Sequence, residues 1–385
     1  MNTILPALAL ALLLACPGGA RAADEPATPV DVVEDAARLA VTIGGKDYAL
    51  GAVVVRLPGE SRLPVALVTH GASPGKPRAA TIDGIRGWAH DLAHRGWLAV
   101  AVMRRGYGES DGEVTDNGDT CTSPDVGRYL EAHADDLEAA LRSIGRRPDA
   151  DMDRVLALGA SAGAAAVMAL AARPSARLAA VVNVSGGLTP LGPFQRDPAC
   201  APYEADLVWN FARFGRTAHM PTLWLYAEND GLFRPGLVSR MRSAFAGTGG
   251  RAELVMLPPF RDDGHALFYA WGGKRRLLPE LDRFLRANKL PTWDESAFEP
   301  LLARLSFADA QAVQQYLQSL AAEKALALAP GGGVHWWQGA PTAAEARSSV
   351  LADCRKKRGV DCTLAAENYR PLVQAPPEAA ARPSP

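Results

Sequence analysis

The chain has 385 residues, of which 48% are hydrophobic, and a formal net charge of −1. This length is enough to bury a full core, and it predicts one large domain and a smaller one. The near-neutral charge argues against a nucleic-acid or anionic-membrane partner that bulk electrostatics would recruit.

The N-terminus predicts a secretory signal peptide over residues 1–22. An apolar core at 4–15 precedes a small-x-small cleavage site that ends at Ala22. The core is too short for a permanent transmembrane helix, and no other membrane span is predicted. The mature protein is therefore expected to be exported, either to the periplasm or out of the cell. A lipoprotein signal that ends at Cys16 is the alternative, because Leu13-Leu14-Ala15 precedes that cysteine.

Residues 23–37 are predicted to be a lead-in, a segment between the signal peptide and the first domain. Residues 38–290 are predicted to form one domain of alternating strands and helices. A hairpin is predicted at 39–57, with its turn at Gly44-Gly45. Further strands are predicted at 63–69, 97–103, 155–158, 178–184, 221–227 and 252–257, and helices at 82–95, 126–144, 162–170, 235–245 and 267–286.

This alternation predicts an α/β fold with a mostly parallel sheet and helices on both faces. Several of the strands are almost wholly apolar, as expected for strands that are covered on both faces. Ligands of open α/β sheets bind at the carboxyl edge of the strands. We expect an insertion at 188–219 to lie over this edge and, with a loop at 113–125, to shape a substrate pocket.

The most informative stretch is Gly159-Ala-Ser161-Ala-Gly163, which joins an apolar strand to an apolar helix. A serine on so tight a strand-to-helix turn is typical of a nucleophile elbow, since only small neighbours fit around it. The turn holds the Ser161 hydroxyl above the sheet edge. The alternative is a Gly/Ala-rich turn with an incidental serine.

A serine nucleophile needs a base to take its proton and an acid to orient that base. Asp230 follows a predicted strand, and His265 lies between the last strand and the last helix, so the chain order is Ser, Asp, His. Glu228 is the rival acid. The alternatives for Asp230 and His265 are a turn former and an exposed histidine at the start of a helix.

The negative oxygen that forms on an acyl group needs two hydrogen-bond donors. The backbone N–H of Ala162 is the first candidate, because it lies at the start of the helix after the elbow. The second should come from the loop after the strand 63–69, where we expect Ala72, with Ser73 as the alternative. His70 is expected to order this loop.

Five motifs together resemble the α/β-hydrolase superfamily, most closely dienelactone-hydrolase-like and prolyl-oligopeptidase-like bacterial esterases. The resemblance covers about residues 38–290 and implies an esterase-type acyl transfer with no cofactor and no metal. Dienelactone hydrolases proper use a cysteine nucleophile, and this chain has serine in that place. The motifs are Thr69-His-Gly71, Arg105-Gly-Tyr-Gly-Glu-Ser-Asp-Gly112, Gly159-Ala-Ser-Ala-Gly163, Glu228-Asn-Asp230 and Asp263-Gly-His265.

Four cysteines remain after residue 22, and an even number in an exported chain predicts disulfides in one of three connectivities. We expect Cys354–Cys362, because these two are close in sequence, which leaves Cys121–Cys200. A metal site is the weaker alternative, since no CxxC or clustered histidine accompanies them.

The rest of the chain predicts a helical connection at 291–323, a small Cys-paired α+β module at 324–370 and a Pro/Ala-rich tail at 371–385. A helix in the module should begin at Thr342, with Glu345 completing a capping box. So small a unit needs its disulfide staple. His335-Trp336-Trp337 predicts either an aromatic core or a contact with carbohydrate or the cell envelope.

These observations favour an exported serine hydrolase that cleaves a small carboxylic ester. A serine peptidase of the same fold is one alternative, and the short region before the domain counts against it, because it leaves no room for a propeller. A non-catalytic envelope-binding protein on a former hydrolase fold is the other. The acyl and alcohol groups and the oligomeric state do not follow from the sequence.

Overall fold

The computed structural model describes residues 32–59, 62–73, 75–115, 121, 123–190, 200–270, 272–293, 295–319 and 323–372. The predicted signal peptide, Cys16, and all but the first two residues of the predicted tail lie outside these ranges. None of the helices within them combines the length and the apolar character needed to cross a bilayer.

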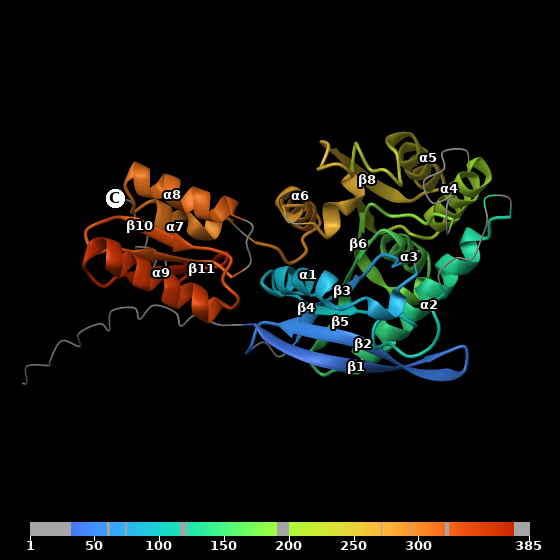
Figure 1. The fold of residues 1–385 in the computed structure, drawn as a ribbon, viewed down its shortest axis with the longest axis horizontal. Coiled ribbons are helices and arrows are strands. Elements are labelled where there is room, and N and C mark those ends of the chain that lie inside the picture. The colour runs from blue at the N-terminus through green and yellow to red at the C-terminus, as the bar shows by residue number, and fades with distance from the viewer. Residues whose placement is uncertain are drawn as a thin grey trace, which may run out of the picture.

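The larger part of the molecule is built on an eight-stranded sheet (Figure 1). Its strand order is β1-β2-β4-β3-β5-β6-β7-β8. The first two strands are antiparallel, and all the others run parallel to one another. The strands are β1 (Val33–Ile43), β2 (Lys46–Arg56), β3 (Leu63–Thr69), β4 (Leu98–Val102), β5 (Ala150–Ala160), β6 (Leu178–Val184), β7 (Pro221–Ala227) and β8 (Arg251–Leu257).

Helices cover both faces of this sheet and bury a separate hydrophobic core on each. Side chains alternate along a strand, so Leu67 of β3 faces one core while Ala66 and Val68 face the other. The first core receives α2 (Val126–Ile144), α3 (Ala162–Ala171), α4 (Ala201–Gly215) and α5 (Pro235–Gly247). The second receives α1 (Asp83–Ala93) and α6 (Lys274–Ala287). The predicted α/β class, with a mostly parallel sheet, is confirmed.

An ion-pair network ties α3 to α2. Arg173, just beyond the end of α3, contacts the carboxylates of Glu131, Asp135 and Glu138 on α2 at 2.7, 2.8 and 2.9 Å. Burial alone would raise the pKa of Glu131 and Glu138, but hydrogen bonds, including those from Arg173, lower it below its ordinary value. The network therefore fixes the helix that begins at the predicted nucleophile.

Three elements differ from the predictions. β1 begins at Val33, so the end of the predicted lead-in belongs to the sheet. The predicted helix 267–286 is split into a 3-10 turn (Gly264–Phe268) and α6, because Gly272 takes a φ of 87° that an α-helix does not allow. The helical part of the 188–219 insertion, α4, packs in the layer of α2, α3 and α5 and not over the sheet edge, since Phe211 stacks edge-on against the buried Trp224 of β7. Residues 191–199 lie outside the described ranges.

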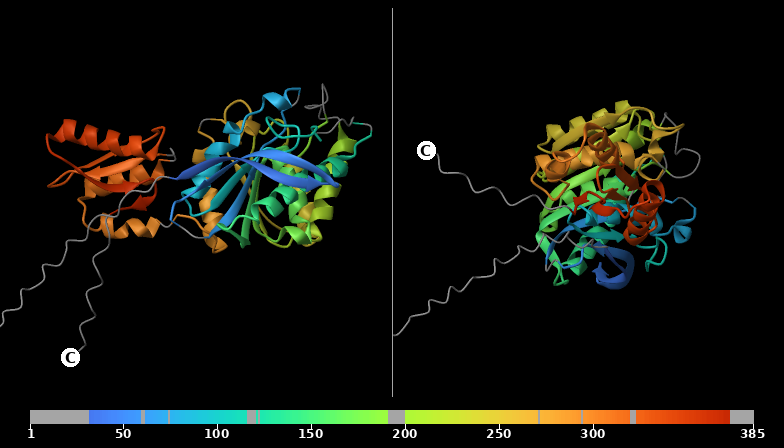
Figure 2. Two further views of the ribbon diagram at one scale, coloured as in Figure 1. Left: turned by 90° about the horizontal axis from the view of Figure 1, so that it is seen from below. Right: turned by 90° about the vertical axis from the view of Figure 1, so that its left-hand side faces the viewer.

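The C-terminal unit, residues 295–372, is a second sheet between helices, with strand order β10-β9-β11-β12. It is larger than the predicted module, because α8 and α7 pack on one face of the sheet while α9 packs on the other. Figures 1 and 2 show it at one end of the molecule, away from α4 and α5. Its elements are α7 (Glu299–Leu302), α8 (Phe307–Gln318), β9 (Ala325–Leu328), β10 (Val334–Trp337), α9 (Ala343–Arg358), β11 (Thr363–Glu367) and β12 (Arg370–Pro371).

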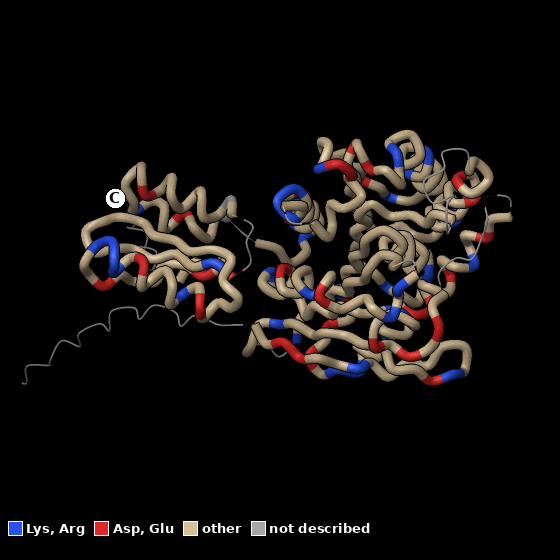
Figure 3. The backbone as a smooth tube through the Cα atoms, in the orientation of Figure 1, with Lys and Arg blue, Asp and Glu red and all other residues tan. Residues whose placement is uncertain are grey.

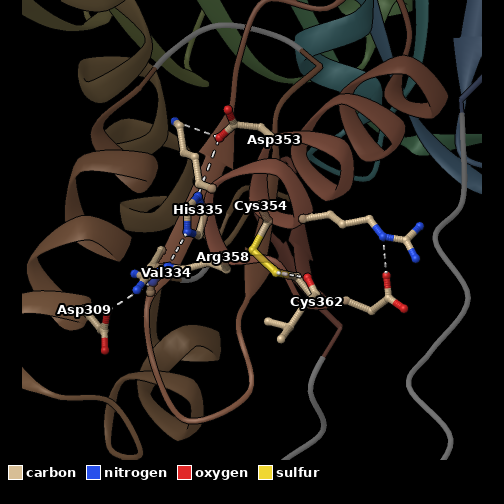
Figure 4. The surroundings of a disulfide bond; sticks show 11 residues. Asp309, Val334, His335, Asp353, Cys354, Arg358 and Cys362 are labelled. Atoms are coloured by element: carbon tan, nitrogen blue, oxygen red, sulfur yellow. Dashed lines mark hydrogen bonds and ion pairs between the residues drawn. A yellow bond between two sulfur atoms is a disulfide. The ribbon is translucent and has the colours of Figure 1, made fainter.

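Both expected disulfides are present. Cys121–Cys200 joins the loop before α2 to the start of α4, and Cys354–Cys362 joins α9 to the segment before β11. Beside the second bond, His335 contacts Arg358 and Asp353 (Figure 4). Of the predicted aromatic patch, only Trp337 is exposed, at 42%.

The two parts of the molecule meet through aromatic and charged contacts. Trp293 stacks on Tyr369 of the C-terminal unit with 3.2 Å between ring centroids, and the guanidinium of Arg95 lies over the Trp293 ring, 3.5 Å from its centroid. Acidic and basic residues are interspersed in both parts (Figure 3). The junction therefore combines aromatic stacking with individual charged contacts.

Candidate active site

The turn between β5 and α3 holds Ser161 in a strained conformation, with φ 53° and ψ −123°. A non-glycine residue with positive φ is uncommon, and such strain concentrates at functional sites. Two glycines make the turn possible. A Cβ on Gly159 would lie 2.4 Å from the carbonyl oxygen of Gly163, and a Cβ on Gly163 would lie 2.2 Å from that of His70. The two glycines of the motif are thus required by backbone packing.

The structure brings Ser161, Asp230 and His265 into one hydrogen-bonded chain. Ser161 Oγ lies 3.1 Å from His265 Nε2, and His265 Nδ1 lies 3.2 Å from both carboxylate oxygens of Asp230. The three residues come from the ends of β5 and β7 and from the segment between β8 and α6. This is the spacing that a serine, its base and its orienting acid require.

Asp230 is 1% exposed, whereas the rival acid Glu228 is exposed. Its Oδ1 accepts hydrogen bonds from the backbone N–H of Leu232 and of Phe233, each at 2.9 Å. These donors compensate the buried charge and fix the carboxylate. The Phe233 ring also packs against the imidazole of His265, 5.5 Å between centroids.

Two further polar residues hold the acid and base loops together. Asp263 Oδ1 accepts from the N–H of His265 and from the N–H of Gly231, both at 2.9 Å. Asn229 Oδ1 accepts from the N–H of Phe260 at 2.8 Å. Both residues stand in the motifs Glu228-Asn-Asp230 and Asp263-Gly-His265, but no role was predicted for them. Their position next to Asp230 and His265 was the available signal.

The loop after β3 lies directly against the serine. A Cβ on Gly71 would lie 3.0 Å from Ser161 Cβ. The buried ring of His70 shapes this loop, because its Nε2 accepts from the N–H of Arg104 at 3.1 Å and its Nδ1 donates to Gly71 O at 2.6 Å. Burial lowers the pKa of His70 well below its ordinary value, so the ring is neutral, as this donor–acceptor pattern requires. The structure thus gives His70 contacts that order the loop.

Tyr269 is a site residue that the sequence analysis missed. Its hydroxyl accepts a hydrogen bond of 2.6 Å from the N–H of Gly71, and its ring edge faces Gly84 of α1. Gly71 N–H is occupied in this way, and Ser73 N–H, the alternative donor, bonds the hydroxyl of Tyr107 at 3.4 Å, so the N–H of Ala72 stays the loop's candidate oxyanion donor. Ala162 is the first residue of α3, where backbone N–H groups have no partner within the helix.

Within the described ranges, one group of side chains has the spacing of metal ligands: His90, His94 and Glu323. The two histidines lie at the C-terminal end of α1, with His94 just beyond its last residue, and Glu323 lies in the C-terminal unit, so the group is apart from the serine-bearing turn. The hydrogen-bonded chain of Ser161 therefore uses no residue of this group.

No protein-family model matches the sequence, and no curated protein matches it. Several solved structures are similar to it in chain path. A Klebsiella pneumoniae protein described as a dienelactone hydrolase is 19% identical, with 67% of this chain and 98% of that chain covered and a TM-score of 0.43. An esterase of Pyrococcus furiosus is 14% identical, with 66% of this chain and 90% of that chain covered and a TM-score of 0.45. Est1E of Butyrivibrio proteoclasticus, solved with ferulic acid, is 16% identical, with 65% of this chain and 98% of that chain covered and a TM-score of 0.47.

The sheet itself identifies the fold. Its two antiparallel strands lead into a parallel series, and the serine lies on the turn after the central strand β5. The chain has the α/β-hydrolase fold, as predicted, with a second α+β unit at its C-terminus.

Proposed function

We propose that this protein is a serine hydrolase that cleaves small carboxylic esters through an acyl-enzyme on Ser161. The observation that carries the proposal is the hydrogen-bonded chain from Ser161 Oγ through His265 to Asp230, with separations of 3.1 and 3.2 Å, on a strained turn. Buried carboxylates, imidazoles and serines meet in this order where a hydroxyl is activated for acyl transfer.

In the first half-reaction, His265 Nε2 takes the proton of Ser161 as Oγ attacks the ester carbonyl. Asp230 holds the imidazole so that Nδ1 carries a proton and Nε2 is the acceptor. The N–H groups of Ala162 and Ala72 stabilise the negative oxygen. When the intermediate collapses, His265 gives the proton to the leaving alcohol, and the acyl group remains on Ser161.

In the second half-reaction, a water molecule takes the place of the alcohol. His265 removes a proton from the water, which attacks the acyl-enzyme, and the same N–H groups stabilise the second intermediate. The proton returns to Ser161 Oγ as the carboxylic acid leaves. No cofactor is needed to balance these steps.

The test is hydrolysis of p-nitrophenyl esters of increasing acyl length by the wild type and Ser161→Ala, with a fluorophosphonate label as a second readout. Ser348→Ala is the matched control, because Ser348 is an exposed serine on α9. We expect turnover and labelling in the wild type and the control, and neither in Ser161→Ala. Labelling without ester turnover, together with peptide cleavage, would favour the peptidase. If the wild type showed no labelling and no turnover, the result would favour the non-catalytic binding protein.

We also propose that the protein works outside the cytoplasm. The two disulfides support this, because such bonds persist in oxidising compartments. A contact with carbohydrate or the envelope through residues 335–337 stays a prediction. Since His335 is bound to its neighbours, Trp337 is the side chain through which such a contact would be made.

A further inference from the structure

Two histidines and a glutamate converge where α1 meets the C-terminal unit. His90 and His94 are one helical turn apart, so their rings face the same side. Glu323 lies just before β9. Glu323 Oε1 is 3.2 Å from His94 Nε2 and 3.9 Å from His90 Nδ1. One ligand atom from each of the three residues lies within 4.8 Å of the others.

These separations are close to those of a bound zinc ion. Zinc binds imidazole nitrogen and carboxylate oxygen at about 2.0–2.2 Å, which places tetrahedral ligand atoms roughly 3.3 Å apart. The pair Glu323–His94 already has this spacing, and the pair Glu323–His90 needs a shift of about half an ångström. Two imidazoles and one carboxylate leave the fourth position of the ion to water.

The neighbours of these three residues orient them as ligands. His90 Nε2 lies 2.5 Å from Glu34 Oε2, and Glu34 is itself ion-paired with Arg86. A proton on Nε2 leaves the lone pair of His90 Nδ1 directed at Glu323, in the carboxylate–histidine arrangement common around metals. Asn368 Nδ2 donates to Glu323 Oε2 at 3.3 Å, which leaves Oε1 for the histidines.

The cluster is enclosed yet reachable. The His94 and Glu323 side chains are 7% and 9% exposed, and that of His90 is 23% exposed. A pocket of about 330 Å³, lined in part by His94 and Asn368, opens beside them and gives an entry path.

We propose that His90, His94 and Glu323 bind one divalent transition-metal ion of the zinc type, which fastens the C-terminal unit to the α/β domain. His90 lies in the last turn of α1 and His94 directly follows the helix, which runs back from the carboxyl edge of the sheet. The ion therefore lies toward the edge opposite Ser161 and takes no part in acyl transfer. Its role is structural, and the proposal is independent of the proposed hydrolase activity.

The experiment uses the full mature chain without a polyhistidine tag, stripped with EDTA and dialysed. Zinc is titrated by calorimetry and cobalt by visible absorption, which reports tetrahedral nitrogen and oxygen ligation. We expect one equivalent of either metal to bind and to raise the midpoint of thermal unfolding. His94→Gln and Glu323→Gln should abolish this binding, whereas Glu34→Gln, which keeps all three ligands, should weaken it by about 10- to 100-fold.

His219→Gln is the matched control, because His219 is an exposed histidine of the α/β domain. It should bind one equivalent like the wild type. Circular dichroism of each metal-free variant shows that it is folded, and Glu34→Gln supplies a graded result even if His94→Gln is unstable. The proposal is overturned if the wild type binds zinc only weakly and at several sites, or if His94→Gln, Glu323→Gln and Glu34→Gln all bind as the wild type does.

Discussion

Gly163→Ala probes the packing that shapes the nucleophile turn. A Cβ at this position would lie 2.2 Å from the carbonyl oxygen of His70 and 3.0 Å from Thr69 Cγ2. Real Cβ contacts essentially never fall below 3.0 Å, so the atoms must separate by about 0.8 Å, the difference between 3.0 and 2.2 Å. The closest contact would be between the backbone of α3, which carries the new Cβ, and the backbone of His70, so a side-chain rotation cannot relieve it. Either α3 or the segment that leads to Ala72 has to move.

The cost of this movement has two parts. Overpacking of this kind destabilises a fold by about 1–3 kcal/mol. A displacement near 1 Å between Ser161 and its oxyanion donors lowers the rate by about 10²-fold. We expect Gly163→Ala to show both losses, measured by urea unfolding followed through tryptophan fluorescence and by kcat for ester hydrolysis.

Gly236→Ala is the control, because a Cβ at that position, in the first turn of α5, meets nothing within 4 Å. Its stability should be unchanged or higher by up to about 1 kcal/mol, since alanine favours helix more than glycine does. If Gly163→Ala matched Gly236→Ala in both stability and kcat, the close approach of α3 to the His70 segment would be wrong.

Three further predictions address the acid, the first disulfide and the ion-pair network. Asp230→Asn should lower kcat by about 10³- to 10⁴-fold with little loss of stability, since asparagine keeps an acceptor oxygen but no charge; an unaltered kcat would leave Asp230 a turn residue only. The double variant Cys121→Ser/Cys200→Ser removes a disulfide between residues 79 apart in sequence, and it should lower the free energy of unfolding by up to about 4 kcal/mol. It should also broaden the selectivity for acyl length, and an unchanged selectivity profile in the folded variant would contradict that part. Arg173→Met should lower the free energy of unfolding by about 1 kcal/mol near pH 7. Because the folded-state pKa values of Glu131 and Glu138 are lowered, that stabilisation is present above their ordinary value of 4.5 and is lost as the pH falls below it. The urea unfolding curves of the two proteins should therefore converge in acid, and the idea fails if the gap persists there.

The parts of the fold that the sequence predicts best are those whose signal is local. The runs at 63–69, 178–184 and 221–227 coincide with β3, β6 and β7, because strands covered on both faces are apolar throughout and end sharply. The split of the last predicted helix was also visible in principle. Gly272 and Gly273 stand together in the middle of it, but its apolar spacing outweighed them.

The parts that the sequence analysis missed depend on contacts between distant segments. Asp263 acts on a backbone N–H 32 residues away, and Tyr269 acts on one 198 residues away. His94 and Glu323 are 229 residues apart. No periodicity or spacing shows which distant group such a side chain will reach, so the predicted serine, acid and base could be named from the sequence while the contacts that hold them could not.

The disulfides also bear on how the chain matures. After residue 22 the cysteines occur in the order 121, 200, 354, 362, and each bond joins neighbours in that order. In a chain that enters an oxidising compartment N-terminus first, thiols that meet as they emerge form these two bonds directly. For an exported chain we therefore expect an oxidase alone, with no isomerase, to suffice for both bonds.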